Sequence, residues 1–177
     1  MNTPDPAATR VRTRRWWIAA LAVLIIVAAG GASYGLARTH HQSSDAAMAD
    51  RARQVMPFDL NRTTHTFTQT PQGGDEKVVV NEPSDTRDRD LIRSHLRIEA
   101  ANFRHGNYSD PARIHGMDMP GVNELQQSAA RVKVVYEQTA GGAQLTYTST
   151  EPTLISALHA WFDRQASDHS APGMGGS

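Results

Sequence analysis

The chain has 177 residues, no cysteine, and equal numbers of basic and acidic residues, 18 of each. The lack of cysteine excludes disulfide bonds, thiolate zinc sites and a cysteine nucleophile. From residue 39 onward there are 13 basic and 17 acidic side chains. A mildly acidic domain is a poor candidate for nucleic-acid binding, because that binding depends on neutralising phosphates.

The N-terminal part of the sequence predicts a membrane-inserting helix. A basic segment, residues 1–15, precedes an uncharged and mainly apolar stretch at residues 16–37. About 20 apolar residues cross a bilayer core, and the arginines before them hold the N-terminus in the cytoplasm. We therefore expect a single-pass protein of the bacterial inner membrane with a periplasmic C-terminal domain. Small residues at Gly35-Leu36-Ala37 leave open a cleaved signal peptide, which would release the domain into the periplasm.

Composition divides the rest of the chain into three parts. Residues 38–60 are small and polar and predict a linker, whereas residues 61–169 predict a soluble domain. Residues 170–177 are rich in glycine and serine and predict a disordered tail. A domain of about 110 residues is long enough for one modest core without disulfides.

An internal repeat within residues 61–169 predicts the fold. Each copy has the pattern of a strand, a Gly-Gly turn, a second strand, a proline and a helix. The glycine pairs are Gly73-Gly74 and Gly141-Gly142, and the prolines are Pro83 and Pro152. Two such ββα units bury their apolar faces together. We expect an α+β fold, in which a four-stranded antiparallel sheet carries two helices on one face.

The helix of the first copy places polar side chains on its apolar face. At about 100° per residue, five side chains define the arc expected to be buried: Leu91, Ile92, Leu96, Ile98 and Phe103. His95, Glu99 and Asn102 fall inside this arc. A buried polar group without a partner costs a few kcal/mol. The three side chains therefore either hydrogen-bond within the core or mark a functional site.

Histidines and methionines are the candidate metal ligands. The loop between the two copies brings His115, Met117 and Met119 within five residues, and imidazole with thioether suits copper, while zinc also accepts imidazole. Folding would add His95 or His159 from the two helices. Methionine in such a loop is also typical of core packing, and His159 is also typical of a surface histidine. Both interpretations stay open.

The sequence lacks the motifs of several large enzyme classes: the Gly-x-Ser-x-Gly elbow, His-Glu-x-x-His, the P-loop and the dinucleotide-binding glycine motif. We therefore interpret the domain as a non-enzymatic, membrane-tethered binding module, with copper or zinc as its candidate cofactor. One alternative is a structural or partner-binding component of an envelope complex. The other is a hydrolase built around His95, Glu99 and His115.

Parts of the domain resemble a family of small exported proteobacterial proteins, over roughly residues 60–169. The similar segments are Thr64–Phe67, Ile114–Gly121, Ala157–Asp163 and Asp168-His169. Members sometimes carry the label aspartate carbamoyltransferase. That enzyme is a much longer, cytosolic, two-domain protein, and its Ser-Thr-Arg-Thr-like phosphate loop is absent here. Some members end in histidine- and methionine-rich tails, of which this chain has only His169 and Met174. The resemblance implies an exported protein and supplies no catalytic residues.

Overall fold

The computed structural model describes residues 43–170 and 173–175. The apolar segment at residues 16–37, with the transmembrane helix or signal peptide expected there, lies outside the described residues. Within the described residues, each helix is too short or too polar to cross a membrane.

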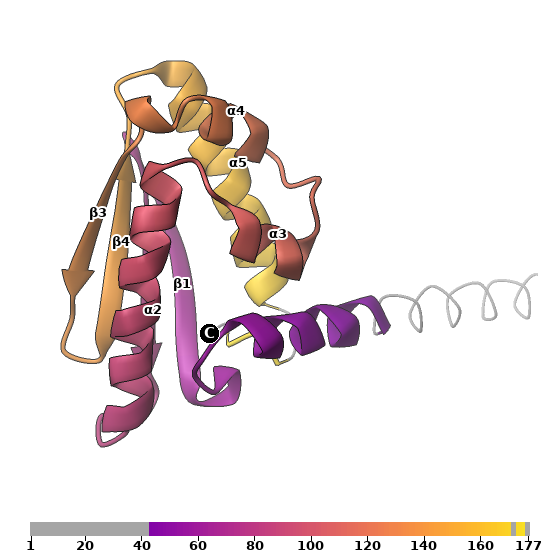
Figure 1. The fold of residues 1–177 in the computed structure, drawn as a ribbon, viewed down its shortest axis with the longest axis vertical. Helices are drawn as coiled ribbons and strands as arrows, with labels where there is room; N and C mark the ends of the chain where they lie inside the picture. The colour runs from indigo at the N-terminus through magenta and orange to yellow at the C-terminus, as the bar shows by residue number, and fades with distance from the viewer. Residues whose placement is uncertain (1–42, 171–172, 176–177) are drawn as a thin grey trace, which may run out of the picture. The chain divides into compact units, whose positions relative to one another are not determined.

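A four-stranded antiparallel sheet forms one layer of the domain (Figure 1). Its strands are β1 (Thr63–Thr70), β2 (Gly73–Val80), β3 (Lys133–Gln138) and β4 (Gly142–Thr148). The strand order β1-β2-β4-β3 keeps each hairpin together and pairs β2 with β4 at the centre. The predicted α+β class and the four-stranded antiparallel sheet are confirmed.

Helices connect and cover the two hairpins. They are α2 (Thr86–Arg104), α3 (Ser109–His115), α4 (Val122–Gln127) and α5 (Pro152–His169), with short 3-10 turns η1 (Leu60–Arg62) and η2 (Ala129–Arg131). Residues 43–55 are helical as well. The helix α2 follows the first hairpin but packs mainly on β3 and β4, and α5 follows the second hairpin but packs on β1 and β2 (Figure 1). Each ββα unit therefore covers the sheet of the other.

The two long helices begin where local chemistry favours a helix start. The carboxylate of Asp85 accepts a hydrogen bond from the backbone N–H of Asp88 at 3.2 Å, which caps α2. In α5, Pro152 occupies the first turn, where its missing N–H has no intrahelical partner. The proline predicted to open the second helix is confirmed in that position.

The first glycine pair has a different role from the one expected. Pro71 and Gln72 form the hairpin turn, and Gly73-Gly74 begin β2. A Cβ on Gly74 would lie 2.2 Å from a ring carbon of Phe162. The glycine therefore lets α5 pack directly on the sheet backbone, which fixes the spacing of the two layers.

Segments before and after the expected domain belong to its core. Met48, Ala52 and Phe58 are buried, and Arg51 Nε donates a hydrogen bond of 2.8 Å to the carbonyl oxygen of Ile114. From residue 44 on, the segment expected as a linker is therefore part of the domain. In the segment expected as a disordered tail, the side chain of Met174 is completely buried.

Candidate functional site

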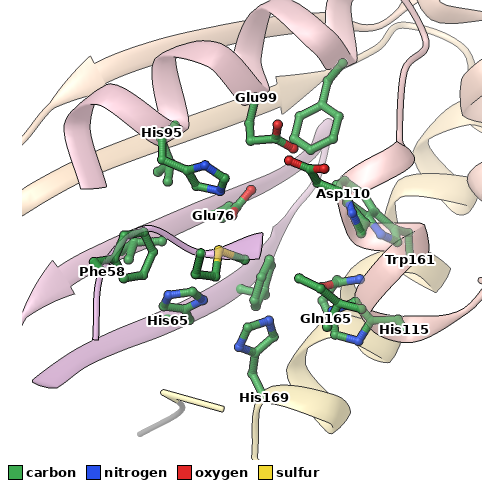
Figure 2. Close-up of a pocket in the computed structure, with 17 residues that line it drawn as sticks. Phe58, His65, Glu76, His95, Glu99, Asp110, His115, Trp161, Gln165 and His169 are labelled. Carbon is green, nitrogen blue, oxygen red and sulfur yellow. The ribbon is translucent and has the colours of Figure 1, made fainter. Parts of the chain in front are cut away.

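A small cavity lined by both polar and apolar side chains lies between the inner face of the sheet and helices α2, α3 and α5 (Figure 2). Its volume is about 30 Å³, which is room for roughly two water molecules. Eight polar side chains line it: His65, Glu76, His95, Glu99, Asp110, His115, Gln165 and His169. Aromatic and aliphatic side chains, among them Phe58 and Trp161, complete the wall. A cavity of this size admits an ion or a very small molecule.

Regular spacing in each element aims these side chains at the cavity. On β1, His65 and Phe67 point to the same face because strand side chains alternate. On α2, His95 and Glu99 lie one helical turn apart, as do Gln165 and His169 on α5. The cavity is therefore built by the sheet and helix periodicities together.

Three imidazole rings lie at one end of the cavity. The ring centroids of His65 and His169 are 4.7 Å apart, and those of His115 and His169 are 5.6 Å apart. Figure 2 shows these three rings around the lower part of the cavity. They come from β1, α3 and α5, so this grouping exists only in the folded chain.

Hydrogen bonds fix the tautomers of two of these rings. His115 Nδ1 lies 2.8 Å from Asp168 Oδ2, and His169 Nδ1 lies 2.8 Å from the carbonyl oxygen of Met174. Because both partners are acceptors, each Nδ1 carries the proton and each Nε2 keeps its lone pair. The Nε2 of His65 is buried without a hydrogen-bond partner in the described part of the chain. Metal-ligating histidines have this same arrangement, with one nitrogen held by an outer acceptor.

The imidazoles are held in the neutral form. Burial lowers the pKa of His65, His95 and His115, and the second-largest contribution at His65 is the neighbouring His169. Burial, with His115 close by, lowers the pKa of His169 to about 4. Neutral imidazole is the form that binds a metal ion.

Carboxyl groups gather at the other end of the cavity. Glu76 accepts a hydrogen bond of 2.8 Å from the Tyr147 hydroxyl, and Glu99 accepts one of 2.9 Å from Asn102 Nδ2. Burial raises the pKa of both Glu76 and Glu99 to about 7, and Asp110 adds to the rise at Glu99. Figure 2 shows Glu99 and Asp110 facing each other. These groups can therefore hold or release protons near neutral pH.

Of the five ligands predicted from sequence, the structure brings two together. His95 and His115 line the cavity. The side chain of Met117 is 77 % exposed, because Gly116 adopts a positive φ of 94° and turns the chain away at the end of α3. Met119 is buried and its Sδ accepts a hydrogen bond from Gln165 at 3.6 Å. It therefore acts as a core residue.

His159, the fifth predicted ligand, lies away from this group. Its Nε2 is 2.9 Å from the carbonyl oxygen of Thr70, at the end of β1. Asp163, one turn further along α5, instead accepts a hydrogen bond from Gln69 at 2.7 Å. His159 thus joins α5 to the first hairpin.

The trio proposed for a hydrolase lines a single cavity. His95, Glu99 and His115 all contribute to its wall. Glu99 is buried, as its place in the helical arc predicted, and it accepts a hydrogen bond from Asn102. By contrast Ile98, expected in the same buried arc, is 57 % exposed, whereas Ile92, Leu96 and Phe103 are buried.

Sequence reasoning missed five of the eight polar lining residues: His65, Glu76, Asp110, Gln165 and His169. A signal existed for two of them. His65 alternates with Phe67 along a strand, and His169 continues the spacing of Trp161 and Gln165 along α5. Polar residues in register with an apolar face are a sign of a buried site.

Among residues 43–170 and 173–175, no group of three or more histidine, aspartate or glutamate side chains is already arranged to hold a metal ion. No family model, curated protein or solved structure matches this chain. The resemblance to exported proteobacterial proteins therefore stays a prediction, and function is inferred from the cavity.

Proposed function

We propose that this domain binds one copper or zinc ion in the cavity, with His65, His115 and His169 as ligands. The observation that carries the proposal is the pair of fixed rings. His115 and His169 each have Nδ1 bound to an outer acceptor, which leaves Nε2 as the donor to a metal. Burying several ionisable groups costs free energy unless they are paired or coordinate a metal, and a bound ion would meet that need.

The ring spacing matches the size of a metal site. With metal–nitrogen distances of about 2.1 Å and tetrahedral geometry, ring centroids lie about 5 Å apart. The two pairs measured here are 4.7 and 5.6 Å apart. Completing the site requires the rings to turn. At the unpartnered Nε2 of His65 this turn breaks no hydrogen bond of the described chain.

The cavity favours an ion over an organic ligand. Its volume of about 30 Å³ excludes a typical metabolite. Glu76 and Glu99, with pKa values of about 7, supply negative charge by releasing protons when a cation enters. In this proposal the segment at residues 16–37 tethers the module to the inner membrane, with the domain in the periplasm.

The test is metal titration of the full-length chain, purified in detergent and freed of metal. Zinc(II), copper(II) and copper(I) would each be titrated against a chromophoric chelator. We expect one tight site that His115→Ala and His169→Ala each weaken at least 100-fold. His159→Ala is the matched control. It should retain the affinity for metal, since the His159 ring contacts the carbonyl oxygen of Thr70 and does not line the cavity. An equal loss in His159→Ala, or no stoichiometric binding, contradicts the proposal.

A second candidate is metal-assisted hydration of a very small substrate. The observation that favours it is the convergence of His95, Glu99 and His115 on one cavity. Glu99, with a pKa of about 7, would take a proton from water as the water oxygen bonds to carbon dioxide, giving bicarbonate. Stopped-flow assay of the metal-loaded chain tests this. Turnover lost in Glu99→Gln when the variant is assayed at saturating metal supports it, and a rate equal to that of free metal refutes it.

The partner-binding alternative has less support. In the described part of the chain, the exposed large apolar side chains are Ile98, Met117 and Val135. They lie in α2, in the loop after α3 and in β3. Only Val135 of the three lies on the sheet, so the described residues show no large apolar patch there that would favour this alternative.

A further inference from the structure

The C-terminal residues Gly173–Gly175 contact two of the proposed ligands at once. The backbone N–H of His65 donates a hydrogen bond of 2.6 Å to the carbonyl oxygen of Gly175. The carbonyl oxygen of Met174 accepts the hydrogen bond of 2.8 Å from His169 Nδ1. One short segment therefore holds the backbone of one ligand and the ring of another.

Packing holds this segment in place. The side chain of Met174 is completely buried, and both flanking glycines have positive φ angles, 82° at Gly173 and 74° at Gly175. A Cβ on Gly175 would lie 3.0 Å from the carbonyl oxygen of Leu60, and one on Gly173 would touch Ala49. The segment thus fits between the helix at residues 43–55 and the start of β1.

We propose that residues 173–175 are the outer shell of the metal site, so that docking of this segment and metal binding are thermodynamically coupled. This inference rests on the proposed function. The Met174 carbonyl keeps the proton of His169 on Nδ1, which leaves Nε2 free for the metal. Without that acceptor the ring can rotate or change tautomer. Met174 is therefore a positioning residue that acts through its backbone.

The coupling can be measured in two ways. If the docked segment raises the affinity for metal by a given factor, bound metal raises the equilibrium constant for docking by the same factor. Loss of an outer-shell acceptor typically weakens metal binding about 10- to 100-fold. We expect a change of that size here, because the segment touches both His65 and His169.

The first experiment compares metal affinity in three variants of the full-length chain. A chain ending at Ser170 removes the segment, and Met174→Ser removes its buried anchor. Met117→Ser is the matched control, since Met117 is 77 % exposed. We expect affinity to fall 10- to 100-fold in the shortened chain, by a smaller factor in Met174→Ser, and not at all in Met117→Ser. Circular dichroism of each metal-free variant checks that it is folded.

The second experiment uses the unaltered chain, so it does not depend on a variant folding. Amide hydrogen exchange at His65 reports docking, because its N–H is bonded to Gly175. Saturating zinc should slow this exchange at least 10-fold, whereas a purely structural tail would show no response. The coupling is contradicted if the metal affinity is equal with and without the segment, or if metal binds but the exchange rate does not change. Either result leaves the proposed metal site standing. Failure of the unaltered chain to bind metal overturns the proposed function and the inference resting on it.

Discussion

The carboxyl group of Glu99 lies inside the cavity and the residue is only 6 % exposed. Burial raises its pKa from 4.5 to about 7, so the folded state binds this proton more tightly than the unfolded state does. The stabilisation is complete below pH 4.5 and is lost as the pH rises through about 7. The folded domain therefore bears the cost of an ionised, buried Glu99 above neutral pH.

Replacing Glu99 by glutamine should remove this dependence on pH. The amide keeps the shape of the protonated acid and still accepts from Asn102. We compare the free energy of unfolding of Glu99→Gln with that of the unaltered chain. When the pH rises from 5 to 8, we expect this difference to shift in favour of the variant by roughly 2 kcal/mol. Urea unfolding of both metal-free proteins at the two pH values measures this shift.

A control separates this effect from the histidines. Burial lowers the pKa of His169 to about 4, so its contribution to stability is lost on acidification, as the pH falls from 6.5 towards 4. Both proteins carry His169, and this opposite trend therefore cancels in the comparison. Glu124→Gln, at an exposed position in α4, should show no such gain. An equal gain there would attribute the effect to net charge instead of to burial.

At the scale of single elements, the sequence predicted what periodicity controls. The internal repeat of two ββα units led to the prediction of the four-stranded sheet. Helical spacing placed Glu99 and Asn102 on the inner side of α2, where they bond to each other. Ile98 was misplaced because the arc was drawn too wide, and the fold decides which part of an arc meets the sheet.

Short elements escaped prediction for a physical reason. The helices α3 and α4 have seven and six residues, and isolated helices of that length are unstable in water. Their existence depends on tertiary contacts such as the hydrogen bond from Arg51 to Ile114. Asp110 lies on α3, so its place in the cavity was equally hidden.

At the scale of the whole molecule, the site is assembled from distant parts of the chain. His65 lies on β1, near the start of the domain, and His169 ends α5. No local pattern connects them, because their meeting depends on α5 packing back onto the first hairpin. The sequence prediction combined the loop around His115 with His95 or His159, and it therefore included only one of the three ligands now proposed.

The polar segment before β1 provides the last prediction, because its composition indicated a linker while its packing makes it part of the core. Ala52 is 1 % exposed within the helix at residues 43–55, and a carboxylate there would be buried without a cation. Ala47 is exposed on the same helix.

We expect Ala52→Asp to lower the free energy of unfolding by about 3 kcal/mol, as for other unpaired buried charges. Ala47→Asp, which has the same helix propensity cost, should lower it by about 0.5 kcal/mol. Urea unfolding of the full-length chain compares them. Similar small losses in both would mean that this helix is a tether outside the cooperative unit. A large loss confined to Ala52→Asp would make it one layer of the domain that encloses the cavity.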